Sequence, residues 1–153
     1  MLAGNCPSYL TIVSRGNFGG YMQKDDVEKF GYTRKELLDE IRICLGGRAA
    51  ELVCYGEEDG VTTGPSSDLR QATNIAKRLV GTYGMDESFG LAVMDEADFK
   101  DKEIREKINE ILKAELKKAV ETISENRILL DRMVTELLAK NHLSADEIKL
   151  LAK

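Results

Sequence analysis

The chain has 153 residues, of which 42% are hydrophobic and 32% charged, and its formal net charge at pH 7 is −5. These proportions are typical of a folded globular protein and exclude a disordered or fibrous chain. No apolar run approaches the roughly eighteen residues of a membrane span, and the first residues lack the pattern of a signal peptide. We therefore expect a cytoplasmic protein. The basic residues form no stripe, which argues against a nucleic-acid partner.

The residue types that build most metal and nucleophile sites are scarce. The single histidine, His142, excludes a histidine-based triad, a histidine pair for zinc and an HExxH motif within this sequence. Because it falls between two expected helices, we expect a solvated or helix-terminal side chain. The three cysteines, Cys6, Cys44 and Cys54, are odd in number and widely spaced, which predicts free thiols in a reducing compartment.

The first elements predicted are two short strands. Tyr9–Val13 is rich in β-branched and aromatic residues, and Gly19–Gln23 follows after a turn that contains Gly16 and Asn17. The glycines at 19 and 20 weaken a strand, but they allow another backbone to approach closely.

Two helices follow. A capping box formed by Thr33 and Glu36 begins the first, which the apolar period predicts to continue to about Tyr55. Gly46 and Gly47 lie inside it at a cost of about 1 kcal/mol each, so we expect something to pack against the backbone there. Residues 57–65 are expected to form a loop. The second helix is expected to begin at an N-cap of Ser66 or Ser67 and to stop near Gly84.

The rest of the chain is expected to be mainly helical. A short strand at 91–93 interrupts an irregular stretch. From about Asp101 the apolar period predicts two helices, with a bend or short turn between them around Glu125 and Asn126. A second capping box, Ser144 with Glu147, opens a terminal helix that runs to Leu151. The predicted fold class is mainly α, with a small antiparallel β element near the N-terminus.

Asp68 is the one candidate site residue that the pattern suggests. It lies in the first turn of the second predicted helix, where the helix dipole favours a carboxylate, and this structural role explains it without any ligand. The competing interpretation is a metal ligand projected from a rigid helix. That role needs partners from elsewhere, because a catalytic zinc takes about three protein ligands plus water.

Several sequence blocks, in order and at matching spacing, resemble the peptidase domain of FtsH-type ATP-dependent zinc metalloproteases. The strand pair at the start and the long broken helix at the end are also similar, so the resemblance covers essentially the whole chain. The blocks that carry it are LGGRAAE at 45–51, TTGPSSDL at 62–69, ATNIA at 72–76 and YGM at 83–85.

The resemblance implies a zinc endopeptidase that degrades unfolded or misassembled proteins. It also implies that an ATP-driven unfoldase, an AAA ATPase module outside this sequence, delivers these substrates. Such proteases usually assemble as hexamers. In the family, two histidines of an HExxH helix bind zinc and its glutamate activates the bound water. The third ligand falls on Asp68 here. The resemblance then explains Gly46 and Gly47, because residues this small allow the metal-bearing helices to pack closely together. The segment Gly19, Gly20, Tyr21 and Met22 resembles the edge strand that pairs with an extended substrate.

The same resemblance predicts one domain over 1–153, with a metal-site half at 1–97 and C-terminal helices at 98–153. The family's HExxH helix would lie just upstream of Leu2, and the sequence lacks it. Two interpretations follow: a piece of a longer, often membrane-tethered protease, or a truncated and catalytically dead helical assembly or regulatory module. Both predict that this chain alone has no peptidase activity and no tight zinc site. Both also predict a dimer or another association through the surface that the missing helix would cover.

Overall fold

The computed structural model describes residues 6–14, 20–23 and 30–152. The chain separates into two compact units, one of residues 30–123 and one of residues 1–29 together with 124–153. We call them the helical unit and the sheet unit. These two units do not coincide with the predicted metal-site half at 1–97 and C-terminal helices at 98–153. That division stays a prediction about the complete peptidase domain. In the described ranges, no helix is both long and apolar enough to cross a bilayer.

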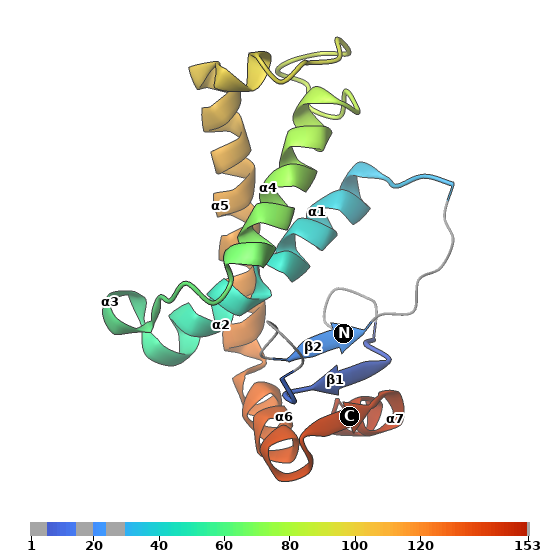
Figure 1. Ribbon diagram of the computed structural model, residues 1–153, viewed down its shortest axis with the longest axis vertical. Helices are drawn as coiled ribbons and strands as arrows, with labels where there is room; N and C mark the ends of the chain where they lie inside the picture. Colours follow the sequence, from blue (N-terminus) through green and yellow to red (C-terminus); the bar gives the residue numbers. More distant parts are fainter. Residues whose placement is uncertain (1–5, 15–19, 24–29, 153) are drawn as a thin grey trace. The chain divides into compact units, whose positions relative to one another are not determined.

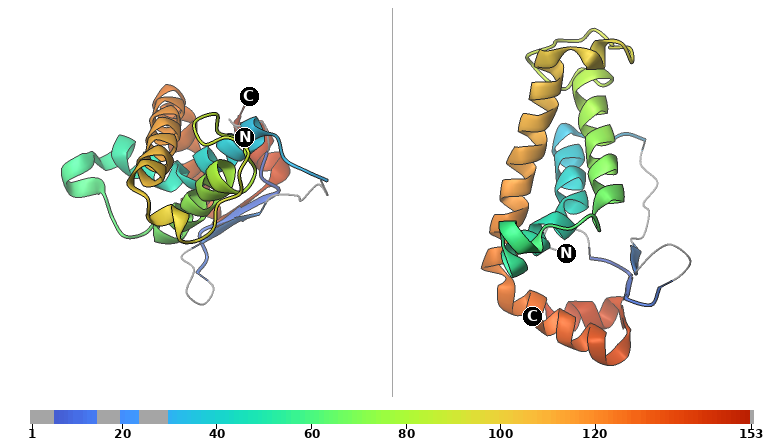
Figure 2. Two further views of the ribbon diagram at one scale, coloured as in Figure 1. Left: turned by 90° about the horizontal axis from the view of Figure 1, so that it is seen from above. Right: turned by 60° about the vertical axis from the view of Figure 1, so that its left-hand side comes forward.

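The helical unit is built around three long helices (Figures 1 and 2). Its elements are α1 (Arg34–Cys44), α2 (Gly46–Tyr55), α3 (Glu57–Gly60), α4 (Ser66–Gly81), the 3-10 turn η1 (Asp98–Lys100) and α5 (Lys102–Glu125), whose last two residues belong to the sheet unit. The predicted apolar stripes of α1, α4 and α5 form one core. Its fully or nearly buried members include Ile41, Leu45, Ala72, Ala76, Leu79, Val80, Ile104, Ile108 and Ile111.

The predicted helix from Thr33 to Tyr55 is two helices. The capping box of Thr33 and Glu36 begins α1 as expected. Leu45 ends α1 and also caps α2, so that Gly46 and Gly47 are the first residues of a new helix. Glycine costs a helix less at its end than in its interior, which explains the break at this point.

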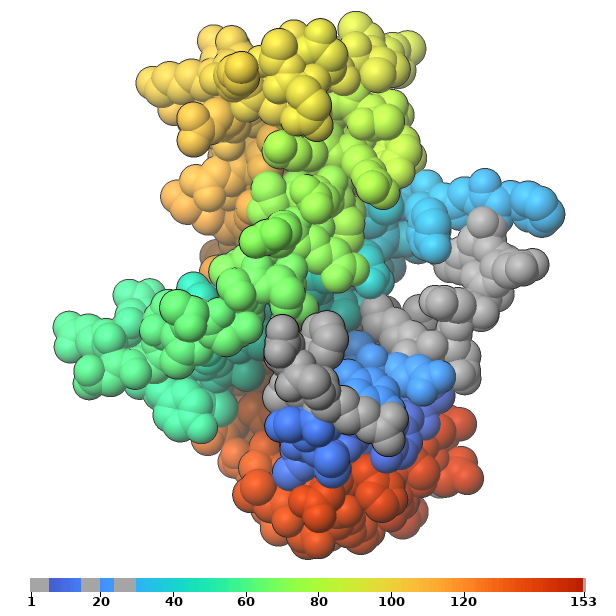
Figure 3. Space-filling view, viewed as in Figure 1, coloured from blue at the N-terminus to red at the C-terminus, as the bar shows by residue number. Residues whose placement is uncertain are grey.

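Three further local predictions are corrected. The segment 57–60 forms the short helix α3, which stands out at the surface of the helical unit (Figure 3). The predicted strand at 91–93 does not form; Leu91 and Val93 are exposed, and the Met94 N–H donates to the Gly81 carbonyl instead. Helix α4 ends at Gly81, earlier than expected, although Gly84 adopts the left-handed φ of 58° that a chain reversal favours.

A buried ion pair joins α1 to α5. The Glu115 side chain is only 2% exposed, and its carboxylate accepts from Arg42 at 2.7 Å and from Lys118 at 2.7 Å. Because both carboxylate oxygens are paired, this charge is compatible with its burial. In the described part of the chain, no buried side-chain nitrogen or oxygen lacks a hydrogen-bond partner.

The sheet unit contains a three-stranded antiparallel sheet in the order β2-β1-β3. Its elements are β1 (Tyr9–Thr11), β2 (Tyr21–Gln23), α6 (Arg127–Lys140), β3 (His142–Ser144) and α7 (Ala145–Leu151). The predicted strand pair, the break after Glu125 and the capping box at Ser144 are confirmed. The third strand was not predicted, and it places His142 in the sheet, exposed and stacked on the Tyr9 ring at 5.9 Å.

Candidate functional site

Asp68 lies in the first turn of α4, as predicted. Its side chain is exposed and makes no hydrogen bond or ion pair with any described residue. The N-terminal end of a helix carries a partial positive charge that stabilises a carboxylate at this position. The predicted caps, Ser66 and Ser67, are instead the first two helical residues. Pro65 holds the cap position, where it offers no side-chain acceptor.

The loop before α4 is fastened to α2 through Thr62. The Arg48 guanidinium donates to the Thr62 carbonyl at 2.8 Å, and the Thr62 N–H and hydroxyl both donate to the Glu51 carboxylate. Arg48 also donates to Glu51 at 3.0 Å. The hydrogen bond from the Thr62 hydroxyl, more than the neighbouring Arg48, holds the pKa of Glu51 below its ordinary value. The anchor therefore stays ionised at neutral pH.

Between Thr62 and Asp68, the loop is held by hydrogen bonds and by a buried proline. The Thr62 hydroxyl oxygen accepts from the Gly64 N–H at 3.0 Å, and the Ser66 N–H donates to the Thr63 carbonyl at 3.1 Å. Pro65 is buried. Each residue between the anchor and α4 is thus held by a backbone bond or by burial, so α2 determines where Asp68 is presented.

The two glycines of α2 differ in their surroundings. A Cβ added at Gly47 would lie 3.6 Å from the Pro65 ring and 3.9 Å from a carboxylate oxygen of Asp68, which is ordinary contact. A Cβ added at Gly46 would meet nothing within 4 Å among the described residues. No described residue therefore packs closely against Gly46. The expected close packing there stays a prediction, which concerns a helix outside these residues.

The predicted substrate edge falls on the outermost strand of the sheet. Among the described residues, strand β2 pairs with β1 alone, and Tyr21 and Met22 are exposed. A Cβ added at Gly20 would lie 2.6 Å from the Thr11 carbonyl oxygen, so this glycine permits the close backbone approach that was predicted. Gly19 lies outside the described residues.

The described residues do not form a metal site on their own. Within them, no three side chains of His, Cys, Asp or Glu lie close enough together to hold one ion. His142 belongs to the sheet unit, whereas Asp68 belongs to the helical unit. Asp68 is therefore an exposed carboxylate in the first turn of α4 with no partner among the described residues, and a zinc site would need its other ligands from outside these residues.

Comparison with known protein families shows which family this chain belongs to. Residues 5–151 match the profile of peptidase family M41. The chain belongs to this family. Its M41 relatives include proteins named ATP-dependent zinc metalloprotease FtsH from Mesomycoplasma conjunctivae and Bacillus subtilis, at 37% and 35% identity over 93% and 92% of the chain. An FtsH 3 from Sphaerobacter thermophilus is 36% identical over 99% of the chain.

These relatives are much longer than the M41 chain. The matched region is 21% of the first relative, 24% of the second and 31% of the third. The chain thus spans less than a third of each.

Sequence reasoning assigned no role to Arg48 and Glu51 of this M41 chain, although both lie in a block that carried the resemblance. Their spacing of three residues on a helix is typical of an ion pair, and that signal was present. Their second function, holding Thr62, depends on contacts that span fourteen residues from Arg48 and eleven from Glu51, which no local pattern contains.

Proposed function

We propose that this chain is the C-terminal part of the peptidase domain of an ATP-dependent zinc metalloendopeptidase, and that Asp68 is the third zinc ligand. The observation that carries the proposal is the state of Asp68: it is exposed, has no partner among the described residues, and lies in the first turn of α4, directly after a loop that is bonded to α2. A carboxylate that is rigidly placed and unpaired is suited to completing a metal site. The names of the M41 relatives support zinc as the metal.

The residues present fit one position of such a site. The remaining ligands would be two histidines of an HExxH helix contributed from outside these residues, and bound zinc would supply an activated water. We therefore expect the isolated chain to bind zinc weakly and to cleave nothing. ATP would act only through a separate AAA ATPase module, and the family's hexamer would be the assembly in which both work.

The proposed substrate is an extended, unfolded polypeptide. The outer edge of strand β2 pairs with no other described strand, and its exposed residues Tyr21 and Met22 flank the backbone to which a substrate strand would add. Strand addition uses main-chain hydrogen bonds, so it accepts many sequences. That property suits a protease that degrades misassembled proteins of many kinds.

The experiment is to join a segment that carries the HExxH helix expected for the family to the N-terminus of this chain. We expect the joined protein to bind zinc and to cleave casein, and we expect Asp68→Ala to lose both. Asp59→Ala, which removes another exposed carboxylate from the same unit, is the matched control and keeps both. Zinc binding and cleavage that survive Asp68→Ala would refute the ligand assignment. A joined protein that folds but binds no zinc would favour the alternative, a catalytically dead assembly module.

A further inference from the structure

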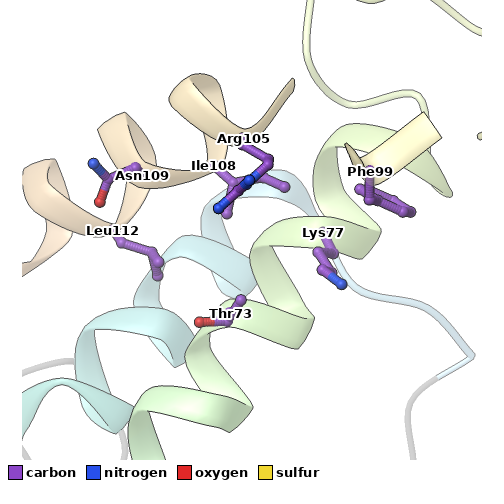
Figure 4. A pocket seen from close by; sticks show the side chains of 7 residues that line it. All are labelled: Thr73, Lys77, Phe99, Arg105, Ile108, Asn109 and Leu112. Atoms are coloured by element: carbon purple, nitrogen blue, oxygen red, sulfur yellow. The ribbon is translucent and has the colours of Figure 1, made fainter. Parts of the chain in front are cut away.

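A groove between α4 and α5 shares no lining residue with the Asp68 site. It has a volume of about 220 Å³. Its lining residues are Thr73, Lys77, Phe99, Arg105, Ile108, Asn109 and Leu112 (Figure 4). All of them belong to the helical unit.

The polar groups around this groove are mainly donors. Lys77 and Arg105 form no ion pair with any described residue, and the Asn109 amide makes no side-chain hydrogen bond among them. The Thr73 hydroxyl donates back to the Leu69 carbonyl at 2.8 Å. No carboxylate lines the groove, although acidic residues outnumber basic ones in this chain by 27 to 22. Two positive charges therefore face one small groove without a neutralising partner in it.

The rest of the lining is apolar and fixed in place. The Lys77 ammonium lies 5.1 Å from the centre of the Phe99 ring, an attractive arrangement that keeps the charge at the rim. Phe99 packs against the backbone at Gly81, where an added Cβ would lie 2.6 Å from the ring. Ile108 belongs to the buried core and Leu112 packs against it, so the floor is rigid.

We propose that this groove binds a carboxylate side chain that lies next to an apolar residue in a segment of a separate partner polypeptide. The two cations and the amide complement the carboxylate, and the apolar floor with Phe99 takes the neighbouring side chain. The volume is below the range of about 300–1,000 Å³ that holds a cofactor or another drug-sized molecule, and it suits one or two side chains. The proposal does not depend on zinc or on peptidase activity.

The test uses the chain as it is and two capped synthetic peptides, acetyl-Leu-Glu-Leu-Glu-amide and its glutamine counterpart. NMR titration at low salt is expected to give saturable binding of the glutamate peptide, with amide shifts confined to α4, η1 and α5. Lys77→Gln/Arg105→Gln is expected to weaken this binding about tenfold, as two partly exposed ion pairs would. Arg78→Gln/Lys113→Gln removes the same charge from exposed positions on the same helices and is expected to bind as the parent does.

A charge swap provides the second measurement. Lys77→Glu/Arg105→Glu is expected to reject the glutamate peptide and to bind acetyl-Leu-Lys-Leu-Lys-amide. The proposal is overturned if the glutamate peptide does not saturate, if the glutamine peptide or free acetate binds equally well, or if both double variants behave alike. If the chain self-associates and Lys77→Gln/Arg105→Gln abolishes this self-association, the groove binds a second copy of the chain. That result would overturn the proposal of a separate partner polypeptide.

Discussion

The two units of this chain are stabilised in different ways. The helical unit has a continuous core drawn from α1, α4 and α5. The sheet unit has strands of only three residues, and its longest complete helix, α6, contains no fully buried residue. Among the described residues of this unit, Leu143 and Ile148 are the completely buried apolar side chains. The helical unit can therefore hold Asp68 in place by its own packing, whereas the sheet unit offers an accessible edge and less internal support.

The largest expected effect comes from the helical core. Leu79→Ala removes a side chain that is 0% exposed, and we expect it to lower the free energy of unfolding by about 2–5 kcal/mol. Leu138→Ala in α6, where the side chain is 69% exposed, is expected to cost less than about 0.5 kcal/mol. Urea unfolding followed by circular dichroism measures both. Equal losses would contradict the contrast between the two units.

A smaller loss is expected at Gly20, the residue before β2. Gly20→Ala would place a Cβ 2.6 Å from the Thr11 carbonyl oxygen, and we expect it to destabilise the sheet unit by about 1–3 kcal/mol. Gly31→Ala is the control, because an added Cβ there meets no described residue within 4 Å. Hydrogen exchange at the amides of β1 and β2 reports the effect. Unchanged protection in Gly20→Ala would show that this close approach is not required.

The sheet unit should also respond to acid through the cap of α7. The Ser144 N–H, with the Lys140 ammonium and the Ser144 hydroxyl, lowers the pKa of Glu147 from 4.5 to about 2. Because the folded state favours the carboxylate, this cap stabilises the unit fully above pH 4.5 and is lost as the pH falls toward 2. We expect Glu147→Gln to lack that part of the pH dependence of unfolding and Asp146→Asn to keep it. Parallel acid profiles for the parent and Glu147→Gln would exclude this role.

The smallest expected effect is at Gly46. No described residue lies within 4 Å of a Cβ added at Gly46, the first residue of α2, so Gly46→Ala should stabilise the isolated chain by less than about 0.5 kcal/mol, below the cost of glycine inside a helix. The same substitution should weaken a protein that also carries the HExxH helix, if that helix packs here. Thermal unfolding of both forms compares them. Stabilisation of equal size in both would remove Gly46 from the proposed packing surface.

Local chemistry in the sequence was enough to predict much of this structure. Both capping boxes, Thr33 with Glu36 and Ser144 with Glu147, form as expected because each needs only four consecutive residues. The apolar periods of α1, α4 and α5 likewise predicted the core.

The misses depend on contacts that no short window contains. Strand β3 exists because Thr11 pairs with His142 and Tyr9 with Ser144, far apart in the sequence. Residues 91–93 have strand-forming types but pair with no described strand. Asp68 was found by its position and by the family resemblance, whereas its anchor through Thr62 required the folded α2 and the loop together.

The zinc content of the protein joined to an HExxH segment tests most directly whether Asp68 is a zinc ligand. We expect one zinc per chain after dialysis, and almost none in Asp68→Ala when circular dichroism shows the same helix content. Asp68→Asn, which keeps the shape but not the charge, should bind zinc more weakly than the parent. Full zinc occupancy in Asp68→Ala would contradict the assignment.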